Sequence, residues 1–539
     1  NNPIPFLSRR HLLNQCGAGL GMTALSCLLH EQGLLGAGPD VDSKDSLAPR
    51  QPHFPARATS VIWIFVNGGH SQVDTWDYKP ELARHHGKTI DIEMRRRSIR
   101  KEKILGPVRE FKRHGQSGLW CSDAFPHTAL HMDKMAVIKS LYMDSFAHGS
   151  ANIQMNSGRV LQGHPALGAW IAHGLGSANK NLPSFVVMLD PRGGPIPGAA
   201  NWTSGYMPAA YQGTVLRSSG NPILDLASRS VRTHRMQGER IDAINALNGM
   251  HIRSRQGYSE LAARIASYDL AYQLQSTAPE ALDISSESGK TKAMYGLYDK
   301  KVDHSIAISP AHFGRQCLVA RRLVERGVRF VQLYSGGGHQ QQNWDAHNGV
   351  DENLKIHCPE VDKPIAGLLG DLEQRGMLEE TLVIWGGEFG RQPVFQGKNG
   401  GRDHNPKGFT YWMAGAGVKA GPDYGETDEL GHEAVVNRHH IRDLHATILH
   451  LMGLDHNELT FPFGGLDREA DTAERVPAAG SGTGGFLGPC GGDRGHTGGG
   501  HQEAREGAAN GLGGHLQGRV LRAWGPGDAC GFPGTGRGR

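Results

Sequence analysis

Carboxylate and imidazole side chains are concentrated in one stretch of the sequence, residues 344–405. The stretch begins with Trp-Asp-Ala-His and ends with Gly-Arg-Asp-His-Asn. Imidazole nitrogens together with carboxylate oxygens are typical ligands of zinc, manganese or iron, whereas sets rich in oxygen suit magnesium or calcium. The residue types therefore predict a site for a divalent metal ion, such as Zn, Mn, Ca or Mg. Its predicted ligands here are Asp345, His347, Glu388 and His404.

These candidate ligands lie close to segments that are predicted to be strands. The apolar run Val328–Leu333 precedes Asp345 and His347, and the apolar run Thr381–Trp385 precedes Glu388. In open parallel α/β sheets, ligands bind beyond the carboxyl ends of the strands. Polar residues at successive strand ends are therefore expected to share one crevice.

Two earlier runs end in the same way. The continuous apolar run 61–66 suits a strand that is buried on both faces, and Asn67 follows it directly. A second run, which begins at Ala136, leads to Asp144 and His148. By the same positional argument, Asn67 joins the predicted metal ligands.

Structural interpretations of these residues stay open. Asp345 could cap a turn, and Glu388 could form a salt bridge with Arg391 that holds a loop. Asp443 and His445 lie in the last predicted helix, where capping or packing is the favoured interpretation.

The segments around the candidate residues alternate between helix and strand. Helical spacing of apolar residues covers 241–275, 314–326 and 441–452. A further helix is predicted to begin at Asp362, with Pro364 in its first turn. Helix and strand in this order, with short connections, predict an α/β fold in which a mostly parallel sheet has helices on both faces.

The two ends of the chain differ in composition from the body. Ser8-Arg9-Arg10 precedes a weakly apolar run rich in Gly and Ala, which favours a twin-arginine export signal over an ordinary short helix. Beyond about residue 475 the chain is rich in glycine and lacks aliphatic periodicity, so we predict disorder, although a reading-frame error in the source gene would give the same change. The predicted regions are a twin-arginine signal and linker at 1–58, one domain at 59–470 and a Gly-rich tail at 471–539. The expected location is the periplasm or cell envelope.

Composition excludes several other classes. The formal charge of +4 is small for 539 residues, so nucleic acid and anionic membranes are not indicated as partners. No segment is a comfortable transmembrane span. Cys121, Cys317 and Cys358 are the cysteines of the body and show no CxxC spacing, so neither a disulfide framework nor a thiolate zinc site is indicated. The basic cluster at 95–101 is interpreted as a solvated surface, with an anion site as the alternative.

With these residues established, the chain resembles the exported bacterial proteins of the domain-of-unknown-function 1501 family, often loosely labelled sulfatases. The resemblance covers roughly residues 55–470. It rests on Phe-Val-Asn-Gly-Gly at 65–69, the helical segment 313–325, Trp-Asp-Ala-His at 344–347, Gly-Glu-Phe-Gly-Arg at 387–391 and Gly-Arg-Asp-His at 401–404. It implies the alkaline phosphatase and sulfatase superfamily, an alkaline-phosphatase-like core, one or two divalent metals, and hydrolysis of phosphate or sulfate esters.

The sequence departs from the superfamily pattern at two ligands. Superfamily enzymes place an Asp after the first strand, where this chain has Asn67, and an Asp-His pair where it has Glu388-Phe389. Asp345 and His347 match a later ligand segment, and His404 matches a final His ligand. A neutral amide for an anion, and a phenyl ring for an imidazole, should weaken metal binding or change the choice of metal.

The nucleophile is not assigned by the sequence. The superfamily uses a Ser, Thr or modified Cys at a helix N-terminus, and no Cys-x-Pro-Ser-Arg segment occurs here, which counts against a formylglycine sulfatase. Ser71, Ser145 and Ser150 are conceivable nucleophiles. Arg391 or Arg402 could hold a tetrahedral oxyanion.

Two functional hypotheses follow. The first is an exported metal-dependent hydrolase of sulfate or phosphate esters, with a small molecule or a glycan as substrate. The second is an exported binding or structural protein that retains the fold without the chemistry, which the departures at Asn67 and Phe389 favour.

Overall fold

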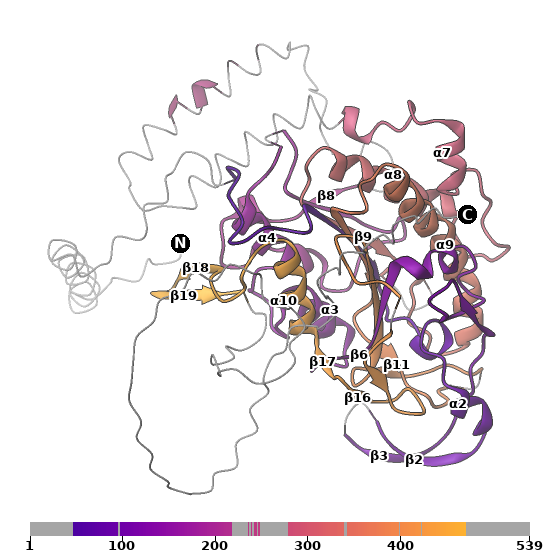
Figure 1. Cartoon of the computed structure of the whole chain (residues 1–539). Helices are drawn as coiled ribbons and strands as arrows, with labels where there is room; N and C mark the ends of the chain where they lie inside the picture. Colours follow the sequence, from indigo (N-terminus) through magenta and orange to yellow (C-terminus); the bar gives the residue numbers. More distant parts are fainter. Residues whose placement is uncertain are drawn as a thin grey trace, which may run out of the picture.

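A computed structural model of the chain describes residues 47–470 except for 95–96, 180, most of 218–278, 339–341, 398 and 422 (Figure 1). The predicted export signal, most of the predicted helix at 241–275 and the predicted disordered tail lie outside the described residues.

A nine-stranded sheet forms the centre of the described part of the chain. Its middle strand, β1 (Ser60–Val66), pairs in parallel with β10 (Thr381–Gly386) and with β9 (Phe330–Ser335). Of the nine strands of this sheet, only β13 (Phe409–Ala414) runs antiparallel to its neighbours. The strand order is β14 (Asp423–Tyr424), β6 (Met135–Tyr142), β13, β10, β1, β9, β7 (Phe185–Met188) and β8 (Thr214–Leu216), with β17 (His439–His440) beside β6. The predicted mostly parallel α/β sheet is confirmed.

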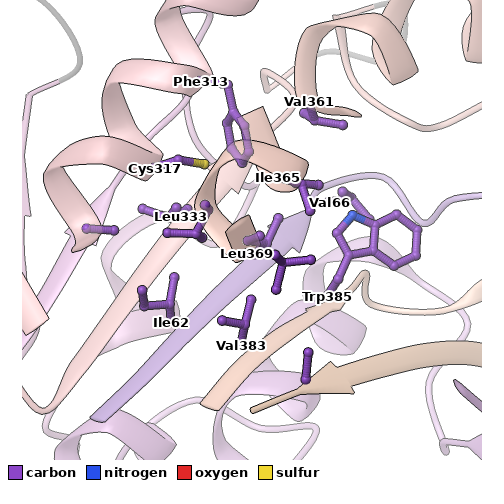
Figure 2. Close-up of a cluster of buried hydrophobic side chains, with 14 of the residues drawn as sticks. Ile62, Val66, Phe313, Cys317, Leu333, Val361, Ile365, Leu369, Val383 and Trp385 are labelled. Carbon is purple, nitrogen blue, oxygen red and sulfur yellow. The ribbon is translucent and has the colours of Figure 1, made fainter. Parts of the chain in front are cut away.

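One face of the sheet is covered by α8 (Pro310–Glu325) and α9 (Val350–Gln374). Side chains alternate between the faces of a strand, so Ile62 and Val66 of β1 point to the same side. Figure 2 shows these two side chains packed with residues of both helices and of the neighbouring strands. The labelled partners are Phe313, Cys317, Leu333, Val361, Ile365, Leu369, Val383 and Trp385.

The other face is covered by α4 (Leu167–Leu175) and α10 (Ile441–Leu451), and α3 (His148–Ser157) lies on the same side. Trp63 of β1 faces these helices, and its ring lies 6.3 Å from that of His445 in an edge-to-face arrangement. Asp443 accepts the backbone N–H of His440 at 3.0 Å and closes a capping box. The predicted packing and capping roles are confirmed, and helices cover both faces of the sheet as predicted.

The prediction of a helix that begins at Asp362 is wrong. α9 begins at Val350, after Gly349, and both Pro359 and Pro364 lie within it. The apolar face continues through both prolines, so packing on the sheet outweighs the backbone hydrogen bonds that they remove. The carboxylate of Asp362 instead accepts the backbone N–H groups of His127 and Thr128 at 2.9 and 2.7 Å. It therefore caps the start of the 3-10 helix Thr128–Lys134.

The other described elements are short. The helices are α2 (Pro80–Arg84), α7 (Gly289–Met294) and the 3-10 helices η1 (Gln72–Asp74), η2 (Thr128–Lys134), η3 (Gly198–Trp202) and η4 (Ala209–Tyr211). The two-stranded antiparallel pairs are β2–β3 (Thr89–Glu93, Ile99–Lys103), β4–β5 (Phe111–His114, Leu119–Ser122), β11–β12 (Gly390–Arg391, His404–Asn405), β15–β16 (Glu426–Thr427, Ala434–Val436) and β18–β19 (Thr460–Phe463, Leu466–Glu469). Among the described residues, no helix combines the length and the apolar character that a membrane span requires.

Residues 47–58, which the sequence places in the linker, lie against the helices of one face. The backbone N–H of Arg50 donates to the carbonyl of Leu175 at 2.9 Å, and that of Arg57 donates to the carbonyl of Leu451 at 2.8 Å. The ends of α4 and α10 are therefore joined to the segment that leads into β1.

Leu369→Ala tests the contribution of α9 to the core. The Leu369 side chain is completely buried, so its truncation should lower the free energy of unfolding by about 2–5 kcal/mol, as measured by denaturant titration. Leu130→Ala is the control, because Leu130 is 77% exposed and its loss should cost less than about 0.5 kcal/mol. Equal effects of the two variants would contradict the packing described here.

Candidate metal centre

Four side chains converge on one point. The ligand atoms of His148, Asp345, His347 and His404 all lie within 4.8 Å of one another. Asp345 is central: its Oδ1 lies 2.9 Å from His347 Nε2 and 3.2 Å from His404 Nε2, and its Oδ2 lies 3.2 Å from His148 Nε2. One carboxylate therefore faces three imidazoles.

The turn after β1 fixes the backbone of Asp345. The backbone N–H of Trp344 donates to the carbonyl of Asn67 at 3.0 Å, which joins the two loops. A Cβ atom on Gly68 would lie 2.5 Å from the backbone nitrogen of Asp345, and Gly68 has a φ of +111°. Glycine is therefore required at the point where the loops meet.

The three histidines come from different elements. His148 is the first residue of α3, at the amino end of that helix. His347 lies in the loop between β9 and α9, close to Asp345 in the sequence. His404 lies on β12, where it pairs in register with Arg391 of β11. Convergence of the site therefore depends on the tertiary fold.

Each imidazole is oriented through its Nδ1 atom. Nδ1 of His148 lies 2.6 Å from a carboxylate oxygen of Glu388. Nδ1 of His347 lies 2.5 Å from the amide oxygen of Gln396, and Nδ1 of His404 lies 2.8 Å from the carbonyl oxygen of Phe146. A carboxylate or carbonyl acceptor on the second ring nitrogen is the usual arrangement for a histidine that binds a metal. All three Nε2 atoms are thereby left facing Asp345.

The protonation of His404 indicates a place for a cation. A carbonyl oxygen can only accept, so Nδ1 of His404 carries the hydrogen that faces Phe146. Burial lowers the pKa of His404 to about 3, so the ring is neutral at pH 7 and its Nε2 presents a lone pair. That lone pair faces Asp345 Oδ1 at 3.2 Å. Two atoms that can only accept hydrogen bonds repel each other at this distance. A cation bound by both atoms would remove this repulsion.

Two further atoms of the cluster face each other. His148 Nε2 and Asp345 Oδ2 are buried 3.2 Å apart, and neither forms a hydrogen bond with another described residue. Three imidazole nitrogens with one carboxylate oxygen are a donor set that suits zinc, manganese or iron. The residues present therefore fit a divalent transition-metal ion.

The charges around Asp345 are strongly coupled. Burial would raise the pKa of the Asp345 carboxyl, but Arg391 and the three imidazoles hold it well below its ordinary value. Nη2 of Arg391 lies 2.7 Å from Asp345 Oδ1, and both side chains are buried. Burial lowers the pKa of His148, but the carboxylates of Asp345 and Glu388 outweigh this effect and raise it to about 9. His148 is therefore protonated at pH 7.

The structure brings three of the five predicted ligands together, namely Asp345, His347 and His404. Glu388 lies next to this group, where it accepts the backbone N–H of Gly68 at 2.9 and 3.1 Å and orients His148. The amide of Asn67 donates to the carbonyl of Gly337 at 2.8 Å. Both residues hold loops that carry the cluster.

His148 completes the group and is not among the ligands predicted from the sequence. It follows a predicted strand, and that position is the signal in the sequence that points to it. Phe389 occupies the wall of the cluster, with its ring 5.0 Å from that of His148 and 4.4 Å from that of His404. Phe389 therefore lines the cluster, and the imidazole of His148 comes from α3.

The candidate nucleophiles lie in two places. Ser145 and Ser150 lie on either side of His148 in the sequence, and their hydroxyl oxygens are 2.6 Å apart. Ser71 is buried and donates to Asp74 Oδ2 at 2.5 Å. Asp74 in turn is ion-paired with the buried Arg402 at 2.7 Å.

The arginine beside the cluster, Arg391, donates to several buried acceptors. Besides Asp345, the guanidinium of Arg391 donates to the carbonyl oxygens of Gly68, Gly69 and Arg402. It therefore ties the turn after β1 to the β11–β12 hairpin and places one positive charge beside the carboxylate.

Metal binding should displace a proton from His148. Titration with Zn²⁺ at pH 7 is expected to release about one proton, because His148 has a pKa of about 9 and binds metal only as the neutral ring. Isothermal titration calorimetry in two buffers of different ionisation enthalpy counts that proton. A binding heat that does not depend on the buffer would contradict the assignment of His148.

Two variants separate ligands from orienting residues. His404→Ala should abolish stoichiometric zinc, as measured by elemental analysis, whereas Glu388→Gln should weaken zinc binding about 10–100-fold. His312→Ala is the matched control, because His312 is exposed on α8. Unchanged zinc content in His404→Ala would rule out this centre.

The solved structures that match this chain include hydrolases. The sulfatase PsFucS1 from Pseudoalteromonas sp. is 13% identical with a TM-score of 0.31, and the match covers 81% of this chain and 71% of that chain. The alkaline phosphatase from the Antarctic bacterium TAB5 is 10% identical with a TM-score of 0.29, over 75% and 100% of the two chains. The phosphonate monoester hydrolase SpPMH from Silicibacter pomeroyi is 10% identical with a TM-score of 0.30, over 73% of each chain.

None of the curated proteins matches the sequence. The model of the family described as "Protein of unknown function (DUF1501)" matches residues 58–478, which is most of the chain. The prediction from the sequence motifs is confirmed: the chain belongs to the DUF1501 family.

Proposed function

We propose that this protein is an exported, metal-dependent hydrolase of sulfate or phosphate esters. The observation that carries the proposal is the convergence of three Nε2 atoms on the buried carboxylate of Asp345. The sequence resemblance to the alkaline phosphatase and sulfatase superfamily supplies the class of ester.

The residues of the cluster would divide the work between them. His148, Asp345, His347 and His404 would hold the ion. A bound divalent ion would polarise the ester and offset the negative charge that develops as the bond breaks. Arg391 holds Asp345 ionised and in place.

The ester would approach from the side of His148 and His347. Their side chains are 15% and 20% exposed, whereas those of Asp345 and His404 are 1% and 6% exposed. The hydroxyl pair of Ser145 and Ser150 lies close to His148 in the sequence. An attacking group would be water or one of these hydroxyls.

Hydrolysis of p-nitrophenyl sulfate and p-nitrophenyl phosphate tests the proposal. Turnover of one of them should depend on added Zn²⁺ or Mn²⁺, and His347→Ala should lower kcat/KM at least about 100-fold, since a ligand of the polarising ion is lost. His312→Ala should leave kcat/KM unchanged. Ser150→Ala tests whether the Ser150 hydroxyl is the attacking group. If it is, this variant should lose turnover and keep its bound metal.

The alternative is an exported binding or structural protein that retains the fold without the hydrolytic chemistry. Asn67 and Phe389 favour it, because the superfamily has metal ligands at both positions and here Asn67 bonds to a backbone carbonyl while Phe389 packs against imidazoles. Stoichiometric zinc with no turnover of either ester would support this alternative and contradict the hydrolase.

Export is tested separately. Replacement of Arg9 and Arg10 by lysine should retain the protein in the cytoplasm, as measured by fractionation of cells that express the full chain. Delivery of this variant to the periplasm as efficient as that of the parent would contradict the twin-arginine route.

A further inference from the structure

The β2–β3 hairpin carries cationic side chains that the metal centre does not use. Those of Arg97, Arg100, Lys101 and Lys103 are exposed, and no ion pair joins any of them to a described carboxylate. In contrast, Glu93 of the same hairpin is bound to Lys407 at 2.8 Å. We call the β2–β3 hairpin with these four exposed side chains the cationic hairpin.

The root of the cationic hairpin lies beside the metal centre. The backbone N–H of Phe395 donates to the carbonyl of Lys103 at 2.9 Å. The next residue, Gln396, contacts His347 through its side chain, with its Oε1 atom 2.5 Å from Nδ1 of the imidazole. One short chain of contacts therefore connects Lys103 to a predicted metal ligand.

The hairpin also contacts the segment that follows His404. Glu93, near the turn of the hairpin, forms its ion pair with Lys407. Figure 1 shows β2 and β3 projecting at the lower edge of the molecule, away from the helices that cover the sheet. At about 3.3 Å per residue, each five-residue strand extends roughly 17 Å. These two contacts thus fix the hairpin to the segments that neighbour His347 and His404.

Arg97 has a backbone conformation that most side chains avoid. Its φ is +58°, and its backbone N–H donates to the carbonyl of Met94 at 2.8 Å to close the turn. Glycine or asparagine would adopt this left-handed conformation with less strain. The turn nevertheless presents an exposed guanidinium, which can bind a sulfate or phosphate group with two parallel hydrogen bonds.

We propose that the cationic hairpin binds the anionic groups of a polysaccharide that carries several sulfate or phosphate esters. Its binding would hold one ester of the polymer at the metal centre while neighbouring esters contact the exposed cations of β3 and of the turn. This inference rests on the proposed function and adds the substrate class: a polyanionic polysaccharide rather than a small monoester.

The composition of the hairpin favours this polymer over a single-stranded nucleic acid. Single-stranded nucleic acids are bound by cationic grooves together with aromatic side chains on which the bases stack. Residues 88–103 contain no aromatic residue. The whole chain has a formal charge of only +4, so the cationic hairpin is a local feature and not part of a generally basic surface.

Binding of labelled polymers tests the proposal. The full-length protein is titrated, in the presence of EDTA, against fluorescein-labelled dextran sulfate and dextran phosphate, and Kd is measured by fluorescence anisotropy. Arg100→Gln/Lys101→Gln/Lys103→Gln should raise Kd at least about tenfold for one or both polymers and should flatten the dependence of Kd on salt, since fewer counterions are released.

Matched variants control for charge and folding. Lys290→Gln/Lys300→Gln/Lys419→Gln removes the same charge from exposed positions elsewhere and should leave Kd unchanged. Lys101→Arg/Lys103→Arg keeps the charge and should keep the binding. Equal Tm values for all variants exclude unfolding as the cause of a weaker interaction.

Three results would overturn the proposal: no binding of either polymer by the parent protein, equal losses in the two triple variants, or tighter hairpin-dependent binding of duplex DNA or of phosphatidylglycerol vesicles.

Because EDTA is present, the binding result does not depend on catalysis. Turnover of p-nitrophenyl esters with no effect of the hairpin on polymer binding would reject the substrate class alone. Hairpin-dependent binding without any turnover would reject the hydrolase alone.

Discussion

A buried carboxylate, Asp345, is the group around which the candidate centre is built. Its desolvation would be costly without compensation, and Arg391 supplies a full positive charge at 2.7 Å. The same guanidinium donates to the carbonyl oxygens of Gly68 and Gly69, so the ion pair also fixes the turn after β1. Removal of either partner would leave an uncompensated buried charge and would release that turn.

The sheet could be predicted from the sequence because its central strands are unambiguous. The run at 61–66 and the run at 381–385 are apolar without alternation, which is the pattern of strands buried on both faces, and they form β1 and β10 side by side. The start of α9 could not be predicted in the same way. Local preference places Pro364 in a first turn, but tertiary packing on the sheet carries the helix through it.

The candidate site was only partly accessible to sequence reasoning. A position directly after a strand identifies residues at the edge of the sheet where the site lies. This argument is sufficient to identify Asp345 and His347 as residues of the site. It does not give the direction of a side chain: Asn67 lies at the same edge and bonds to the carbonyl of Gly337. His148 faces the cluster because the connection from β6 to α3 brings the amino end of that helix to Glu388, and no local pattern in the sequence records that approach.

The reversed direction of β13 has a consequence for how this family could diversify. Because β13 is antiparallel to its neighbour β10, the chain leaves the sheet after Gly386 and returns at Phe409 along the same edge. The intervening excursion is closed near its base by the pairing of Arg391 with His404. Within this excursion Gln396 and Gly401 also bond to each other through their backbones, so the length can change at small entropic cost, and without displacing a strand, in the turn between these two residues. Insertions there would reshape the rim of the centre while the fold stays constant.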